Sequence, residues 1–135
     1  MPVNERKTVV DVEGNQDALI YSLNSYKSTS KTLLLDGHFC LFSAKLEIQR
    51  IPAITFERIA PMSVIVLVEE VEIIKRRLID RDCVSYNLEL IREFQTHELE
   101  YAKKICGLLK IPHLEVNPNI GVDEAITFLK KHTNK

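Results

Sequence analysis

A chain of 135 residues, 45% hydrophobic and 27% charged, has the length and composition of one globular domain with a single sizeable core. Its formal net charge of −1 gives no electrostatic basis for binding nucleic acid or an anionic membrane surface. No apolar run approaches the roughly 20 residues of a membrane-spanning helix, and the N-terminus has no signal-peptide segment. The three cysteines lack CxxC spacing, so we expect neither a disulfide framework nor a zinc site, and a cytoplasmic location.

The N-terminal part is predicted to be a loose arm followed by a helix. Residues 1–7 are polar and form the expected arm, and residues 8–12 could form a short extended piece. From Gln16 to Tyr26 apolar residues recur at helical spacing, which predicts an amphipathic helix. Residues 27–31, rich in Ser and Lys, form a turn-forming link.

The stretch that organises the chain is Lys31 to Phe42, KTLLLDGHFCLF. Its apolar run at residues 32–35 stops on Asp36-Gly37. A short apolar run bounded by turn residues is typical of a strand buried on both faces of a parallel sheet. Ligands bind at the carboxyl ends of such strands, so Asp36 is placed for chemistry, and Gly37 allows close approach of the backbone.

Two interpretations of Asp36 are open at this point. An acid at the end of a buried strand resembles a Walker-B element, in which the carboxylate holds the Mg²⁺ of a nucleoside triphosphate through water. Alternatively, Asp36 only caps the following turn, because Asp-Gly is a common turn dipeptide.

The next segment mixes short elements with a second strand. Residues 47–51 alternate polar and apolar, which predicts a small edge hairpin or an extended loop. Residues 54–59 could form one or two helical turns. Ser63 to Val68, SVIVLV, is β-branched and continuous, and it predicts a second buried strand that is closed by Glu69-Glu70.

The C-terminal half alternates helices with one more strand. We expect helices over residues 72–82, 88–109 and 123–131, a third parallel strand at 113–116, a short loop at 82–87 and a polar tail at 132–135. The buried stripe of the long helix would be Leu88, Ile91, Phe94, Leu99, Ala102, Ile105 and Leu109. Asn87 or Ser85 could cap this helix, because a short polar side chain accepts from the free amides of the first turn. The alternation predicts right-handed crossovers and a three-layer α/β sandwich with a parallel sheet.

Arg77 and Arg81 lie four residues apart, and so on one face of the predicted helix. Each guanidinium fork can bind two phosphate oxygens at once, so both side chains could reach the same anionic ligand. The alternative is a solvated helix face with surface ion pairs such as Arg77 with Asp80.

The order of these features resembles the nucleotide-kinase branch of the P-loop NTPases, and more closely the small adenylate-kinase-like ATP-binding proteins. The matching stretches are TLLLDGHFCLF (32–42), VIVLVEEVEIIKRRLIDRD (64–82), YNLELIREFQTHELEYA (86–102) and IPHLEVNP (111–118). The resemblance implies an ATP-binding, kinase-like phosphotransferase built as a single domain over residues 1–135. Its partners would be a nucleoside triphosphate and an unknown phosphoryl acceptor.

The resemblance also implies roles for particular residues. Asp36 would be the magnesium-associated carboxylate of the catalytic site, and it would hold Mg²⁺ through water. Arg77 and Arg81 would be lid arginines that bind the nucleotide and stabilise charge on the transferred phosphoryl group.

Other implied roles concern the nucleotide and the acceptor. Gly37 would belong to the Mg·ATP site, and the Asn117-Pro118 loop would lie near the adenine. Residues 82–87 would form the lid loop, and His38 could face the second substrate or simply pack in a turn. Adenylate kinases proper continue Asp-Gly with an aromatic residue, Pro and Arg, so the resemblance does not extend to a nucleoside monophosphate acceptor.

The sequence contains no GxxxxGK[ST], the loop whose amides bind the phosphates in this class of protein. Lys31-Thr32 has no glycine before it and leads into the predicted strand rather than out of one. We therefore expect a family member that lacks its first strand and phosphate loop and is a catalytic phosphotransferase only if an upstream segment supplies that loop. From these residues alone we expect little ATP hydrolysis. The remaining strands would pair directly, or a second copy of the chain would cover the exposed sheet edge.

Two further interpretations remain. The chain could be a non-catalytic remnant of the kinase fold that serves as a binding or oligomerisation module. It could also be a flavodoxin-type α/β domain that binds a small phosphorylated ligand at its strand ends.

Overall fold

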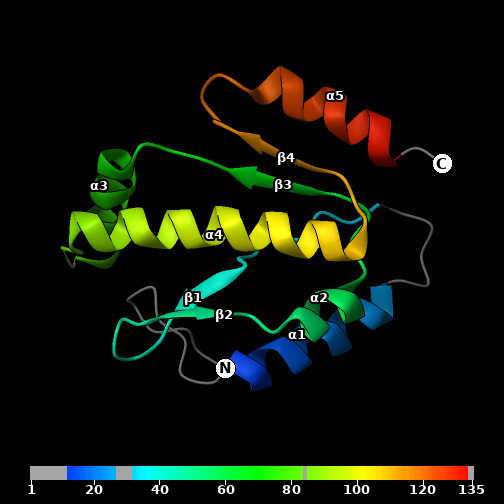
Figure 1. The fold of residues 1–135 in the computed structure, drawn as a ribbon, viewed down its shortest axis with the longest axis horizontal. Coiled ribbons are helices and arrows are strands. Elements are labelled where there is room, and N and C mark those ends of the chain that lie inside the picture. The colour runs from blue at the N-terminus through cyan, green and yellow to red at the C-terminus, as the bar shows by residue number, and fades with distance from the viewer. Residues whose placement is uncertain (1–11, 27–31, 84, 134–135) are drawn as a thin grey trace. The chain divides into compact units, whose positions relative to one another are not determined.

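The computed structural model describes residues 12–26, 32–83 and 85–133 and has a mixed α/β fold (Figure 1). The described part contains five helices and two small sheets, each of two strands. It divides into two compact units, Met1–Pro61 and Met62–Lys135. The predicted arm at residues 1–7 and link at 27–31 lie outside the described residues. That both units form one domain stays a prediction.

The first unit combines two helices with a β-hairpin. Helix α1 (Val12–Tyr26) begins four residues before the predicted start, and α2 (Ala53–Ile59) confirms the predicted helical turns. The two helices are in contact, and Arg58 Nη1 lies 3.0 Å from Asp17 Oδ1. Helix α2 ends at Ala60, which adopts a left-handed conformation with φ 52°.

Strands β1 (Cys40–Phe42) and β2 (Ile48–Arg50) form the antiparallel hairpin, with Leu41 opposite Gln49. The hydroxyl of Ser43 accepts hydrogen bonds from the backbone N–H groups of Lys45 (3.2 Å) and Glu47 (3.1 Å), which closes the turn. The alternation at residues 47–51 is thus a hairpin strand, in a sheet of its own.

The buried strand predicted at residues 32–35 is not present. Leu33, Leu34 and Leu35 are 46%, 81% and 46% exposed and belong to no strand. A buried parallel strand needs hydrogen-bonded neighbours on its edges, and in the described part of this unit the only paired strands are β1 and β2, which pair with each other. Pairing begins at Cys40, so Asp36 does not stand at the carboxyl end of a strand.

Gly37 also differs from expectation. Its φ is not positive, and a Cβ built on it would have no atom within 4 Å. The close backbone approach predicted for this glycine is therefore not formed.

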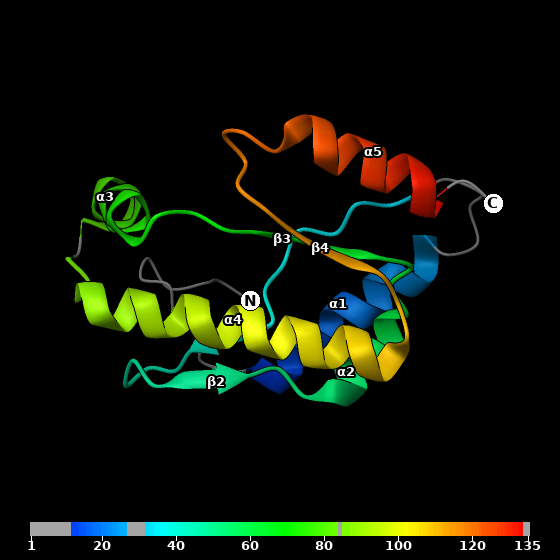
Figure 2. The same ribbon diagram turned by 45° about the horizontal axis from the view of Figure 1, so that its top comes forward.

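The second unit contains the parallel strands. Strand β3 (Val64–Leu67) pairs in parallel with β4 (His113–Val116), with Val64 opposite His113 and Leu67 opposite Val116. Helices α3 (Val71–Asp82) and α4 (Leu88–Leu109) connect them, and α5 (Val122–Thr133) follows β4. In both Figure 1 and Figure 2, α4 and α5 lie on opposite sides of the strand pair. Helix α3 packs on α4.

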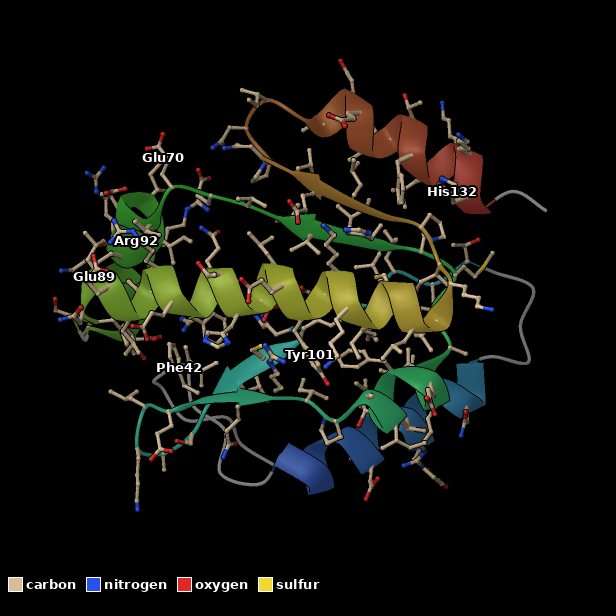
Figure 3. All side chains as sticks on the ribbon, in the orientation of Figure 1. Phe42, Glu70, Glu89, Arg92, Tyr101 and His132 are labelled. Atoms are coloured by element: carbon tan, nitrogen blue, oxygen red, sulfur yellow. The ribbon has the colours of Figure 1, made fainter. Side chains whose placement is uncertain are left out.

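Helix α4 begins and ends where the sequence predicts. Asn87 Oδ1 accepts from the backbone N–H groups of Glu89 (2.8 Å) and Leu90 (3.4 Å), so Asn87 rather than Ser85 is the N-cap. Lys110 ends the helix in a left-handed conformation with φ 56°. An ion pair between Arg92 and Glu89 lies near the start of the helix (Figure 3).

The buried face of α4 agrees with the predicted stripe only in part. The buried residues are Ile91, Phe94, Tyr101, Ala102, Ile105 and Cys106. Tyr101 and Cys106 were not predicted, whereas Leu88, Leu99 and Leu109 are only half-buried. None of the helices in the described residues is sufficiently long and apolar to cross a membrane.

Candidate functional site

The site is built at the carboxyl end of β3. The backbone N–H of Val64 donates to Pro112 O (3.1 Å) and that of Val68 donates to Val116 O (2.9 Å), so alternate residues of β3 pair with β4. The backbone N–H and C=O groups of successive residues in a strand point to alternate edges. Those of Ile65, Leu67 and Glu69 therefore point to the edge of β3 that faces away from β4.

Gln95, on α4, closes this opposite edge at Glu69. Its Oε1 accepts from the backbone N–H of Glu69 (3.1 Å), and its Nε2 donates to the backbone carbonyl of Glu69 (3.0 Å). One side-chain amide thus supplies both hydrogen bonds that a neighbouring strand would make. This contact fixes the end of β3 against α4.

The carboxylate of Glu69 joins three segments. The residue is only 7% exposed. Its Oε2 accepts from Asn119 Nδ2 (2.9 Å) and from Arg77 Nη2 (3.4 Å), and its Oε1 accepts from the backbone N–H of Glu70 (3.1 Å). A buried carboxylate needs such partners, because burial of an unpaired charge is costly. Glu69 therefore ties the end of β3 to α3 and to the loop after β4.

The loop after β4 is held in one shape by Asn117 and Gly121. Asn117 Oδ1 accepts from the backbone N–H of Asn119 (2.9 Å), and its carbonyl accepts from the N–H groups of Ile120 (3.2 Å) and Gly121 (2.8 Å). A Cβ at Gly121 would lie 1.9 Å from Val116 Cγ2, so only glycine fits there. Asn117 therefore shapes the loop, and Asn119 reaches the site.

The two arginines predicted to bind phosphate project from α3 and are both exposed. The side chain of Arg77 is 60% exposed, and among the described residues it contacts Glu69 at 3.4 Å rather than Asp80. The side chain of Arg81 is 58% exposed, and it binds Asp82 through Nε to Oδ1 (2.5 Å) and Nη2 to Oδ2 (2.7 Å). The hydrogen bond with Asp82 raises the pKa of Arg81 above its ordinary value, so this arginine is charged at any working pH.

The predicted loop at residues 82–87 begins one residue later than expected. Asp82 is the last residue of α3 and is buried, and Cys83 follows in a left-handed conformation with φ 56°. Tyr86 is also buried, and its hydroxyl donates to Asp82 Oδ2 (3.3 Å). This buried hydrogen bond holds Tyr86, in the segment between α3 and α4, against the last residue of α3.

The predicted site residues fall into two groups. Asp36, Gly37 and His38 are exposed and precede β1 in the first unit, whereas Arg77, Arg81, Asn117 and Pro118 belong to the second unit. Within the second unit, Glu69 joins Arg77 to the loop that contains Asn117 and Pro118.

Sequence reasoning missed four residues of this arrangement, which are Glu69, Asp82, Gln95 and Asn119. One of them had a usable signal. Glu69 directly follows a predicted strand, as Asp36 was expected to do, so the rule that selected Asp36 also applies to Glu69. Gln95 lies within a helix and has no such signal.

The donor set suits a phosphate better than a bare metal ion. No group of three or more His, Cys, Asp or Glu that could hold a metal ion occurs among the described residues. Magnesium bound with a nucleotide takes phosphate oxygens, waters and only one or two carboxylates, so such a group is not required. Two exposed guanidinium groups four residues apart on α3 fit the phosphates of such a ligand.

We compared the chain with models of protein families, with curated proteins and with solved structures, and none of these comparisons gave a match. The interpretation of the site therefore rests on its own geometry.

Proposed function

We propose that the chain is an ATP-binding, kinase-like phosphotransferase domain of the P-loop NTPase type. One observation carries the proposal: Arg77 of α3 and Asn119 of the loop after β4 share the carboxylate of Glu69 at the carboxyl end of β3. This end of a parallel strand pair is where open α/β folds bind ligands. The same proposal includes the predicted three-layer α/β sandwich with a parallel sheet, in which the first strand and the phosphate loop of this class are missing.

In this proposal the arginines bind the phosphates of Mg·ATP. The contact of Arg77 with Glu69 is 3.4 Å long and uses one nitrogen, so donors remain for a phosphate oxygen. Guanidinium groups bind phosphate oxygens in pairs and stabilise the charge that develops during transfer. The Asn117-Pro118 loop would lie beside the adenine.

The remaining proposed roles belong to the first unit. Asp36 would hold Mg²⁺ through water, with Gly37 beside it, and His38 would face the phosphoryl acceptor. When bound, Mg²⁺ neutralises charge on the phosphates. Because the sequence has no GxxxxGK[ST], we expect binding without appreciable turnover by these residues alone.

Calorimetric titration of the chain with Mg·ATP tests the proposal. We expect micromolar binding, roughly ten- to a hundredfold weaker in Arg77→Ala, because a lost charge-assisted hydrogen bond costs about 1.5–3 kcal/mol. Arg76→Ala is the matched control, since it removes the same charge from an exposed neighbouring position of α3 and should leave binding unchanged. Absence of binding by the unmodified chain would contradict the proposal.

Asp36→Ala tests the magnesium role in the same titration. We expect it to weaken binding of Mg·ATP but not of ATP in excess chelator. A measured turnover that Asp36→Ala abolishes would contradict the expectation that these residues alone hydrolyse little ATP.

A second candidate function is a non-catalytic module that associates with a second copy of the chain. In the described part of the chain, the outer-edge backbone groups of Ile65 and Leu67 have no hydrogen-bond partner, and Leu67 is 63% exposed. Such an edge can pair with another strand. Light scattering at rising concentration tests this candidate: a dimer lost in Leu67→Lys supports it, and a monomer at every concentration contradicts it.

A further inference from the structure

We propose that Asp82 is a positioning residue that holds the guanidinium group of Arg81 with one edge left for a phosphate group. The inference rests on the proposed function, because it concerns how the same site meets the phosphates. It assigns to the buried end of α3 a role that the sequence did not suggest.

The contact between Asp82 and Arg81 determines which edge of the Arg81 guanidinium group can bind a phosphate. Asp82 takes Nε and Nη2 of Arg81, at 2.5 and 2.7 Å. A guanidinium group has five N–H donors, and this side-on contact uses one on each of those two nitrogens. One hydrogen of Nη1 and the second hydrogen of Nη2 form the end-on edge, which can bind two phosphate oxygens.

The difference in burial within the pair gives its members different roles. The side chain of Asp82 is 3% exposed, whereas that of Arg81 is 58% exposed. The carboxylate is fixed from behind by the hydroxyl of Tyr86 at 3.3 Å, and Tyr86 is itself 3% exposed. The buried acid therefore anchors the surface cation, and not the reverse.

The place of Asp82 in the helix argues against a role in helix stability. It is the last residue of α3, where the helix dipole disfavours negative charge. A carboxylate at this position is therefore tolerated through its bonds to Arg81 and Tyr86. Arg77 has no comparable anchor, since its bond to Glu69 is single and 3.4 Å long.

Two effects of removing the Asp82 charge oppose each other, and they make the inference testable. Loss of a negative charge beside Arg81 would by itself strengthen binding of an anion. Loss of the anchor would weaken binding, because an unanchored arginine side chain loses more rotamer entropy when it binds. Positioning therefore predicts weaker binding in Asp82→Asn, and simple electrostatics predicts tighter binding.

The experiment is calorimetric titration of the full chain and its variants with Mg·ATP. We expect Asp82→Asn to weaken binding by about tenfold. Asp80→Asn, on the exposed part of the same helix, makes the same charge change and should leave affinity unchanged or slightly raised. In an Arg81→Lys background, Asp82→Asn should have no further effect, because lysine has no fork to orient.

Tyr86→Phe is the second variant, because Asp82→Asn could disturb folding at a buried position. It keeps every charge and removes the hydroxyl that donates to Asp82 Oδ2 across 3.3 Å. We expect a smaller loss of affinity in the same direction. Unchanged or tighter binding in a folded Asp82→Asn or Tyr86→Phe variant would overturn the inference and leave the proposed function intact.

Failure of the proposed function gives a different result. If the unmodified chain does not bind Mg·ATP, inorganic tripolyphosphate titrated against the NMR signal of the Arg81 Nε–H decides the inference. A shift of this signal in the unmodified chain that is lost in Asp82→Asn supports an oriented anion fork. No shift overturns it.

Discussion

The side-chain amide of Asn119 donates to the buried carboxylate of Glu69 across 2.9 Å, although the two residues lie 50 positions apart in the sequence. The contact joins the loop after β4 to the end of β3. Because the same carboxylate oxygen also accepts from Arg77, both candidate ligand-binding segments of the second unit are fixed by one side chain.

The first prediction concerns this carboxylate. Glu69→Ala removes the acceptor for Asn119, for Arg77 and for the backbone N–H of Glu70, so we expect the free energy of unfolding to fall by about 1–3 kcal/mol. Urea unfolding measures the change. Glu70→Ala is the control, because its exposed side chain makes no capping bond to α3 and its loss should change stability by under about 0.5 kcal/mol.

Hydrogen exchange would localise the effect of Glu69→Ala. Faster exchange is expected for the backbone amides of Asn119, Ile120 and Gly121, which close the loop after β4. Unchanged exchange in this loop would show that Asn117 alone shapes it.

The second prediction compares two glycines. Gly121→Ala places a Cβ 1.9 Å from Val116 Cγ2 and 2.9 Å from the Asn117 carbonyl oxygen, and overpacking of this kind costs about 1–3 kcal/mol. Gly107 lies in α4 with nothing within 4 Å of the added Cβ. Gly107→Ala should therefore stabilise the protein, by up to about 1 kcal/mol, through higher helix propensity. Thermal unfolding of the two variants should shift in opposite directions, and a shift of the same sign would contradict the expected packing at Gly121.

The third prediction concerns the start of α4. Asn87→Ala removes the acceptor for two backbone N–H groups and should destabilise the protein by about 1 kcal/mol. Ser85→Ala changes the other candidate cap, which is exposed and lies outside the helix, and should have little effect. Equal losses of helical circular dichroism on heating of the two variants would argue against Asn87 as the cap.

The fourth prediction concerns the thiols. Cys83 is exposed, whereas Cys40 and Cys106 are buried. We expect one thiol to react rapidly with a water-soluble disulfide reagent in the native protein and all three to react in urea. A Cys83→Ser variant should lose the rapid phase, and two or more rapid thiols in the native protein would contradict the burial.

The fifth prediction follows from Cys106. Burial raises the pKa of this thiol above its ordinary value of 9.0. The folded state therefore holds the proton more tightly than the unfolded state. This contribution to stability is complete below pH 9.0 and is lost as the pH rises through the raised pKa. In Cys106→Ala the decline of unfolding free energy with pH should be shallower than in Cys83→Ala, and parallel declines would contradict the assignment.

The sequence by itself determined the elements that local signals specify. Helix α4 was predicted from its capping residue and apolar period, and β3 from a continuous β-branched run closed by Glu69-Glu70. The third strand predicted at residues 113–116 is β4. Asn87 makes its capping bonds within three residues, so no distant partner is needed to recognise it. Arg77 and Arg81 are both exposed on α3, as predicted, because their spacing of four residues in a helix is also a local signal.

Only the tertiary structure decided which segments pair and which charges are buried. The run at residues 32–35 has a strand-like sequence, but a strand exists only with a hydrogen-bonded neighbour, and the described residues provide none there. The bonds of Glu69 to Gln95 and Asn119 span 26 and 50 residues, and no local pattern encodes them. Asp82 is adjacent to Arg81, yet its burial is set by how α3 packs on α4. Pairing and burial depend on distant parts of the chain, so they follow from the fold and not from neighbouring residues.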